Sequence, residues 1–260
     1  KSFGDSMLIN FITLTSLVGM LILPILGQLF LYPFSTKLCS KVSDYVEFVL
    51  GPRLWKILHT YKKFNFWIYE DDFDKLPEQF IVIANHQSLL DIPCFMNVFQ
   101  KRELRFVAKD ALGKNVPLVS RMLKVQQHCI IPRRAKPMDA MNLMSSFGKR
   151  VKEKNQIPVI FPEGTRTRDG EVGKFYSAGF RKLVESTNLP VVSFAIEGGY
   201  NLRDLTKFFK NLSRGAYRVK IMKIYDCPQT KEDCLNLLEE SRNLINEQVH
   251  QWRQLPSSVK

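Results

Sequence analysis

An uncharged, strongly apolar stretch near the start of the chain constrains the fold more than any other feature. No Asp, Glu, Lys or Arg occurs from Ser6 to Thr36. At about 1.5 Å per helical residue, this stretch is long enough to cross a hydrocarbon layer of about 30 Å. Pro24 and Pro33 interrupt it, so both one tilted spanning helix and two shorter helices in a single leaflet fit the sequence. We therefore expect residues 1–60 to form a membrane-anchoring helical segment.

The charge of the chain calls for an anionic partner. Lys and Arg outnumber Asp and Glu by 38 to 25, which gives a net charge of +13. Six basic residues come after the apolar stretch, namely Lys37, Lys41, Arg53, Lys56, Lys62 and Lys63. Basic residues on this side of a membrane segment place the remainder of the chain in the cytoplasm. No helix-turn-helix, zinc-finger or RNA-recognition pattern accompanies the charge, so we expect a lipid bilayer as partner and no nucleic acid.

The cysteines do not indicate a metal or a disulfide framework. There are five, an odd number, with no C-x-x-C pair and no histidine cluster near them. We expect reduced thiols, no bound metal and no redox cofactor.

Residues 61–260 alternate short β-branched runs with longer amphipathic runs, which is typical of an α/β fold. The expected strands are 64–70, 80–84, 104–108, 128–131, 158–161, 191–196 and 216–224. The expected helices are 89–99, 137–153, 177–186 and 231–252. This order predicts one α/β domain with a mixed, mainly parallel central sheet covered by helices.

Two short motifs carry residues suited to chemistry. In "ANHQSLLDIP" (84–93), His86 and Asp91 lie five positions apart, just after an expected strand. In "VIFPEGTRTRDGEVGKF" (159–175), a turn after another strand combines a glycine, a threonine hydroxyl and the guanidinium of Arg166, which suits a phosphate group. No Walker loop and no G-x-G-x-x-G occurs, which argues against a nucleotide enzyme.

Taken together, "NHQSLLD" (85–91) and "FPEGTRT" (161–167) resemble the motifs of the glycerolipid acyltransferase family, in particular the 1-acyl-sn-glycerol-3-phosphate acyltransferases. The resemblance covers about residues 60–225. It implies that His86 is the general base and that Asp91 orients and stabilises its imidazole.

The same resemblance assigns the remaining site residues. Acceptor phosphate would be bound by Glu163, Gly164, Thr165 and Arg166, with Glu163 orienting Arg166 or a backbone turn. Lys109 and Arg133 stand where the family carries basic phosphate contacts, although Gln127 and Pro132 depart from the usual residues beside Arg133. Asn85 and Ser88 flank the base and would shape the loop or donate towards the thioester oxyanion.

The implied reaction transfers a fatty acyl group from acyl-CoA or an acyl-carrier-protein thioester to the sn-2 hydroxyl of lysophosphatidic acid. Three alternatives stay open: the same chemistry on glycerol-3-phosphate or another lysophospholipid, a non-catalytic membrane adaptor, and, on charge alone, nucleic-acid binding. The acyl thioester is a co-substrate, so no cofactor is expected.

Overall fold

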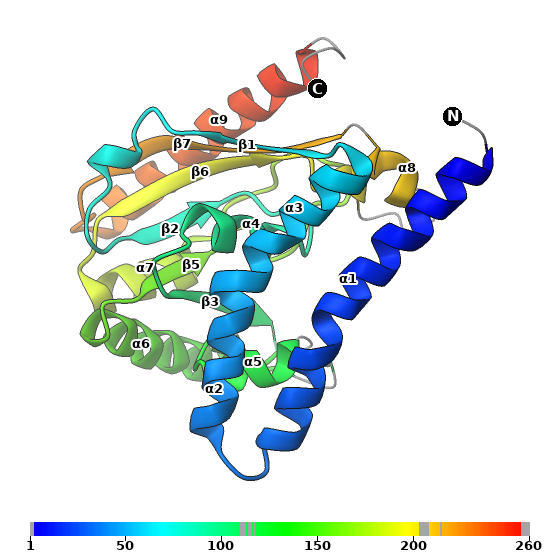
Figure 1. Ribbon diagram of the computed structural model, residues 1–260. Coiled ribbons are helices and arrows are strands. Elements are labelled where there is room, and N and C mark those ends of the chain that lie inside the picture. Colours follow the sequence, from blue (N-terminus) through cyan, green and yellow to red (C-terminus); the bar gives the residue numbers. More distant parts are fainter. Residues whose placement is uncertain are drawn as a thin grey trace.

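The computed structural model describes residues 3–109, 113, 116, 118–202, 208–213 and 215–255 (Figure 1). Its centre is a seven-stranded sheet in the order β1-β7-β6-β2-β5-β3-β4. The strands are β1 (Asn65–Tyr69), β2 (Ile81–Ala84), β3 (Leu104–Lys109), β4 (Cys129–Ile131), β5 (Ile157–Ile160), β6 (Val191–Glu197) and β7 (Ala216–Tyr225). Only β6 and β7 pair antiparallel within this sheet. The predicted mixed, mainly parallel α/β sheet is therefore confirmed.

Helices cover both faces of the sheet. They are α1 (Phe3–Leu31), α2 (Thr36–Tyr45), α3 (Gly51–Lys62), α4 (Asp91–Val98), α5 (Val119–Val125), α6 (Pro137–Glu153), α7 (Ser177–Thr187), α8 (Phe208–Leu212) and α9 (Lys231–Gln254). Side chains of β2 alternate between two hydrophobic clusters. Val82 packs with α3 and α4, whereas Ile83 packs with α6, α7 and α9, so these two sets of helices cover opposite faces (Figure 1).

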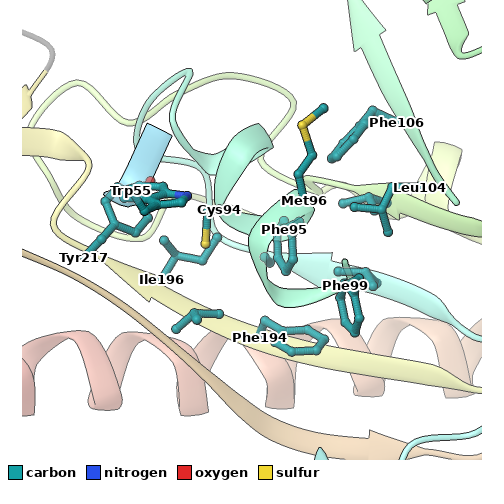
Figure 2. Close-up of a cluster of buried hydrophobic side chains, with 14 of the residues drawn as sticks. Trp55, Cys94, Phe95, Met96, Phe99, Leu104, Phe106, Phe194, Ile196 and Tyr217 are labelled. Atoms are coloured by element: carbon teal, nitrogen blue, oxygen red, sulfur yellow. The ribbon is translucent and has the colours of Figure 1, made fainter. Parts of the chain in front are cut away.

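Aromatic rings fill the core on the α3 and α4 face (Figure 2). The ring of Phe194 on β6 meets Phe95 and Phe99 edge-on, at centroid distances of 5.5 and 5.7 Å. Trp55 of α3 packs on Tyr217 of β7 at 4.9 Å. These contacts hold α3 and α4 against the sheet.

The apolar N-terminal stretch forms one continuous helix, α1, which passes through Pro24 and ends at Leu31 before Pro33. It is long and apolar enough to cross a membrane. Only 11% of its apolar window is buried, so it is not the core helix of the α/β fold. One side of α1 packs against the domain through Leu17 and Met20, and the opposite side is exposed (Figure 1).

A helical segment returns from α1 to the sheet through α2, a π-helical turn at Val46–Leu50, and α3. Its buried residues Leu50 and Trp55 belong to the same core cluster as the sheet. They precede the expected domain boundary at residue 60, yet they pack as part of the α/β body.

Three helical details differ from the sequence-based expectations. Helices α5 and α8 were not expected, because they are short and carry no long amphipathic pattern. Helix α4 begins at Asp91 rather than at residue 89, because residues 85–90 form a loop that wraps around the Asp91 carboxylate. Asp91 is thus the first residue of the helix and not the third, as the expected range 89–99 implied.

Candidate active site

His86 and Asp91 form a hydrogen-bonded pair at the end of β2. The imidazole Nδ1 lies 2.6 Å from Asp91 Oδ2. Asp91 is fully buried, whereas 17% of the His86 side chain is exposed. With the Nδ1 proton held by the carboxylate, Nε2 carries the free lone pair that a general base needs. Among the described residues no hydrogen-bond partner is recorded for Nε2, so it is available to a substrate.

The Asp91 carboxylate is saturated with donors. Oδ2 also accepts hydrogen bonds from the backbone N–H groups of Gln87, at 2.7 Å, and Ser88, at 3.1 Å. Oδ1 accepts one from the hydroxyl of Tyr217, which is completely buried on β7. Burial and the neighbouring Asp91 raise the pKa of Tyr217 well above its usual range, so this hydroxyl remains a donor. These bonds fix the carboxylate and therefore the ring that it holds.

A phenyl ring fixes the imidazole from its face. The ring of Phe161, the first residue of the second motif, stacks on His86 at a centroid distance of 4.2 Å and an interplanar angle of 15°. This contact limits rotation of the imidazole, and an aromatic face also favours the positive charge that the ring acquires when it takes a proton.

Sheet topology brings the second motif beside the first. Strands β2 and β5 are parallel neighbours, with Val82 opposite Val159. The loops at their carboxyl ends therefore lie at the same edge of the sheet. Thr167 N–H donates to the His86 carbonyl at 2.8 Å, which joins the two loops directly.

Glu163 is the buried link between the loops. Oε1 accepts the His86 backbone N–H at 2.7 Å, and Oε2 accepts the Gly173 N–H at 3.0 Å. Burial raises the pKa of this carboxyl, and the two N–H groups oppose that shift. Two roles were expected for Glu163: to orient Arg166 or to orient a backbone turn. Its carboxylate bonds to backbone N–H groups and not to Arg166, which favours the second role.

The three residues after Glu163 face outwards. Gly164 has a φ of 64°, a left-handed conformation that suits glycine at this turn. Thr165 and Arg166 are exposed, and no hydrogen bond or ion pair to a described residue is recorded for either side chain. A hydroxyl and a guanidinium that are free beside the His86 imidazole can bind an anionic group.

The two residues flanking the base have roles within the protein. Asn85 is buried and forms two bonds of 2.8 Å with the backbone of Ile196, so its amide extends the pairing of β2 with β6. Its side chain is therefore occupied and does not point to an oxyanion. Ser88 Oγ accepts the Leu90 N–H at 3.0 Å and lies 3.5 Å from the Tyr217 hydroxyl. Both residues shape the loop.

Lys109 and Arg133 lie at the same sheet edge but further along it. Lys109 ends β3, and Arg133 follows β4 by two residues, and both are exposed. In the strand order, β5 and β3 separate β4 from the strand that carries His86. The structure thus gathers His86, Asp91 and the 163–166 turn, and it sets these two cations to one side of them.

Three supporting residues were missed by sequence reasoning, namely Tyr217, Gln87 and Phe161. Phe161 and Gln87 lie inside the two motifs, and this position is a sequence signal for both of them. Tyr217 carries no such signal, because its contact with Asp91 spans 126 positions of the chain.

Within the described ranges, no group of three or more His, Cys, Asp or Glu side chains is arranged to hold a metal ion. All five cysteines are free, and four of them are buried: Cys39, Cys94, Cys129 and Cys234.

Comparison with known proteins supports the same family. A model of the family described as Acyltransferase matches residues 69–197, which include both motifs. A 1-acyl-sn-glycerol-3-phosphate acyltransferase of Cocos nucifera is 31% identical over 118 residues, 45% of this chain and 37% of that protein. The Homo sapiens 1-acyl-sn-glycerol-3-phosphate acyltransferase beta is 28% identical over 145 residues, 55% of this chain and 49% of that protein. The aligned segments thus span less than half of these relatives.

The fold has a solved counterpart over almost its whole length. The crystal structure of the 1-acyl-sn-glycerophosphate (LPA) acyltransferase PlsC from Thermotoga maritima superposes with a TM-score of 0.63 at 22% identity. The match covers 97% of this chain and 96% of that one. Residues 69–197, which carry both motifs at one sheet edge, thus match the acyltransferase family in sequence, and the similar relatives agree with this match.

Proposed function

We propose that the protein is a membrane-bound 1-acyl-sn-glycerol-3-phosphate acyltransferase. One observation carries the proposal: a His–Asp pair with a free Nε2 lies beside an exposed Thr165–Arg166 turn. A base for a hydroxyl and a cation for a phosphate are the two functions that a lysophosphatidic acid acceptor requires. The names of the curated relatives agree with this substrate.

The reaction needs no acyl-enzyme. Nε2 of His86 takes the proton of the sn-2 hydroxyl while that oxygen attacks the thioester carbonyl. The C–O bond forms, the C–S bond breaks, and the thiolate of CoA or of a carrier protein leaves with the proton from the imidazolium. Asp91 stabilises the positive ring during this step. The products are phosphatidic acid and a free thiol.

Arg166 and Thr165 would bind the acceptor phosphate, and Glu163 would keep their turn next to His86. A correctly held acceptor contributes through proximity, and a general base alone contributes about 10²–10⁴ in rate. Lys109 and Arg133 would act at longer range, by attracting anionic donors or acceptors to this edge.

Helix α1 would place this site at a bilayer. Its exposed face carries large apolar side chains, including Phe11, Leu23 and Phe30. The basic residues that come after α1 favour a cytoplasmic orientation of the α/β domain. Because the acceptor is itself an amphiphile, a site at the membrane surface shortens its path.

The test is thiol release from acyl-CoA by the detergent-solubilised protein, with and without lysophosphatidic acid. We expect His86→Ala to lower acceptor-dependent release by about 100-fold or more. Arg166→Ala should mainly raise the KM for lysophosphatidic acid. Matched controls are His59→Ala and Arg181→Ala, both outside the site.

Further acceptors and donors separate the alternatives. Thiol release with glycerol-3-phosphate or lysophosphatidylcholine, but not with lysophosphatidic acid, would show that the acceptor is one of the former two molecules. A carrier-protein thioester tests the donor in the same way. Absence of release with every pair would contradict an enzymatic role and favour a membrane adaptor.

A further inference from the structure

A recess that none of the proposed active-site residues lines lies between α1 and the helical segment that packs beside it. It has a volume of about 370 Å³ and is lined by Gly19, Met20 and Leu23 of α1 and by Arg53, Lys56 and Ile57 of α3, among others. We call it the α1–α3 groove.

The α1 wall of the groove is apolar and open. Gly19 and Met20 both line the groove and lie four and three positions before Leu23, so each is a neighbour of Leu23 on the helix surface. Leu23 is 76% exposed. A Cβ atom built on Gly19 meets no other atom within 4 Å, so the groove has free space at this position.

The α3 wall of the groove is cationic. Arg53 and Lys56 lie three residues apart, which places their side chains as neighbours on the helix surface. Both are exposed, and no ion pair with a described residue is recorded for either. The Arg53 guanidinium donates to the hydroxyl of Tyr45, which also lines the groove, at 3.3 Å. Two cations and a phenol thus face a groove with an apolar opposite wall.

We propose that the α1–α3 groove binds one anionic phospholipid of the bilayer. An acyl chain would lie along Met20 and Leu23, and the phosphate would lie between Arg53 and Lys56. The combination of an apolar wall with two neighbouring cations fits this ligand better than a neutral lipid or a free anion. The exposed apolar side of α1 continues from the groove, so a bilayer lipid can enter it sideways.

Such a lipid would connect α1 to α3 and make membrane attachment depend on lipid charge. This site goes beyond the proposed acyl transfer, because neither the dyad nor the 163–166 turn takes part. It would distinguish membranes rich in anionic lipid from neutral ones, because basic residues near an anionic surface favour binding.

The experiment measures lipid binding and not catalysis. Delipidated full-length protein is titrated with dioleoylphosphatidylglycerol or dioleoylphosphatidylcholine and analysed by native mass spectrometry. Flotation with vesicles of phosphatidylcholine, with or without about 30% phosphatidylglycerol, gives an independent measurement. We expect one tightly bound phosphatidylglycerol per chain and weaker binding of phosphatidylcholine.

Two variants test the two walls separately. Arg53→Gln with Lys56→Gln removes the cations, and Gly19→Leu fills the groove while keeping the charge. Each should lower phosphatidylglycerol affinity by about tenfold or more. The control, Lys37→Gln with Lys41→Gln, removes the same charge from exposed positions of α2 outside the groove and should retain tight binding.

The outcomes discriminate between a site and general attraction. Equal losses in the control and in the Arg53 and Lys56 variant, with no loss in Gly19→Leu, would overturn the proposal in favour of non-specific attraction. Leucine forms helix better than glycine, so Gly19→Leu should fold, and circular dichroism verifies it. If the wild-type protein binds phosphatidylglycerol in the groove but releases no thiol with any acceptor, only the proposed acyl transfer would be overturned.

Discussion

At the scale of single residues, the candidate site depends on the way in which one buried carboxylate is satisfied. Asp91 has no exposed surface, and an isolated charge there would be costly. Two backbone N–H groups, an imidazole and a phenol meet its two oxygens. The same bonds that make the buried charge tolerable also orient His86, so the burial of Asp91 and the fixed position of the imidazole have one cause.

Tyr217→Phe tests this arrangement. The change removes the donor to Asp91 Oδ1 and leaves the ring that packs on Trp55. A hydrogen bond to a charged group is worth about 1.5–3 kcal/mol, so we expect kcat to fall by about 10- to 100-fold. The KM for lysophosphatidic acid should change little, because Tyr217 is fully buried.

The control for that variant is Tyr225→Phe. Tyr225 lies on the same strand, and its hydroxyl accepts from Ser241 on α9. Thiol release by this variant should match the wild type. Unchanged kcat in Tyr217→Phe, with normal thermal unfolding, would show that the phenol does not position the dyad.

At the scale of elements, the last helix joins the two loops that carry the motifs. Near the end of α9, Arg253 lies 3.3 Å from both carboxylate oxygens of Glu197, at the end of β6. Glu197 in turn accepts from Gln87 Nε2 at 2.6 Å, next to His86. Arg253 also bonds Glu171 at 2.8 Å, on the loop that follows Arg166. Helix α9 therefore connects the loops after β2 and β5 as well as packing on the sheet.

Arg253→Gln should loosen both loops at once. Glu197 is buried, and loss of one partner of a fully buried pair costs about 3 kcal/mol, which is an upper value here because the Arg253 side chain is 29% exposed. We expect lower thermal stability and lower kcat. Arg253→Lys should restore part of both, since it keeps the charge.

A double-mutant cycle checks the assignment to this pair. Adding Glu197→Gln to Arg253→Gln should destabilise by less than the sum of the two single changes. Strict additivity of the two free energies would contradict a direct coupling.

At the scale of the whole molecule, a polar network connects the helical segment at the N-terminal end to the sheet. Glu47, in the π-helical turn, accepts the Leu104 N–H at 2.7 Å and the Gln126 side chain at 2.9 Å. Burial raises the pKa of Glu47 to about 7. Its ionisation thus costs stability as the pH rises from 4.5 towards 7, since the unfolded chain loses that proton earlier.

His128 has the opposite pH dependence. Its Nδ1 accepts the Phe106 N–H at 2.8 Å. Burial, with nearby Arg105 and Arg150, lowers its pKa to about 3. The folded protein keeps this ring neutral, whereas the unfolded chain protonates it below pH 6.5, so His128 makes stability fall as the pH falls.

His128→Asn separates the pH effect of His128 from that of Glu47, because an amide oxygen can accept the Phe106 N–H without titrating. Between pH 7 and pH 5, the wild type should lose at most about 2 kcal/mol of unfolding free energy relative to this variant. The residue is partly exposed, which makes that value an upper one. Urea unfolding in mild detergent measures it, with His59→Asn as control. Parallel pH profiles of wild type and His128→Asn would refute the prediction.

The sequence by itself determined the strands, the longer helices and the two motifs that resemble the acyltransferase family. All seven strands were predicted to within about two residues at either end, because buried parallel strands carry continuous apolar runs bounded by turns. His86, Asp91 and the 163–166 turn were recognisable because each motif is local: its residues lie within one loop and its flanking elements.

Only the tertiary structure decided which groups surround those residues. Strand order places β7 and α9 against the loops, so Tyr217 and Arg253 contact groups more than 50 positions away. The same strand order places Lys109 and Arg133 to one side of His86. It also brings β6 next to β2, so that the Asn85 amide bonds to the backbone of Ile196. Periodicity and propensity act over a few residues, whereas these contacts depend on which strands pair, and the packing of the whole core selects that order.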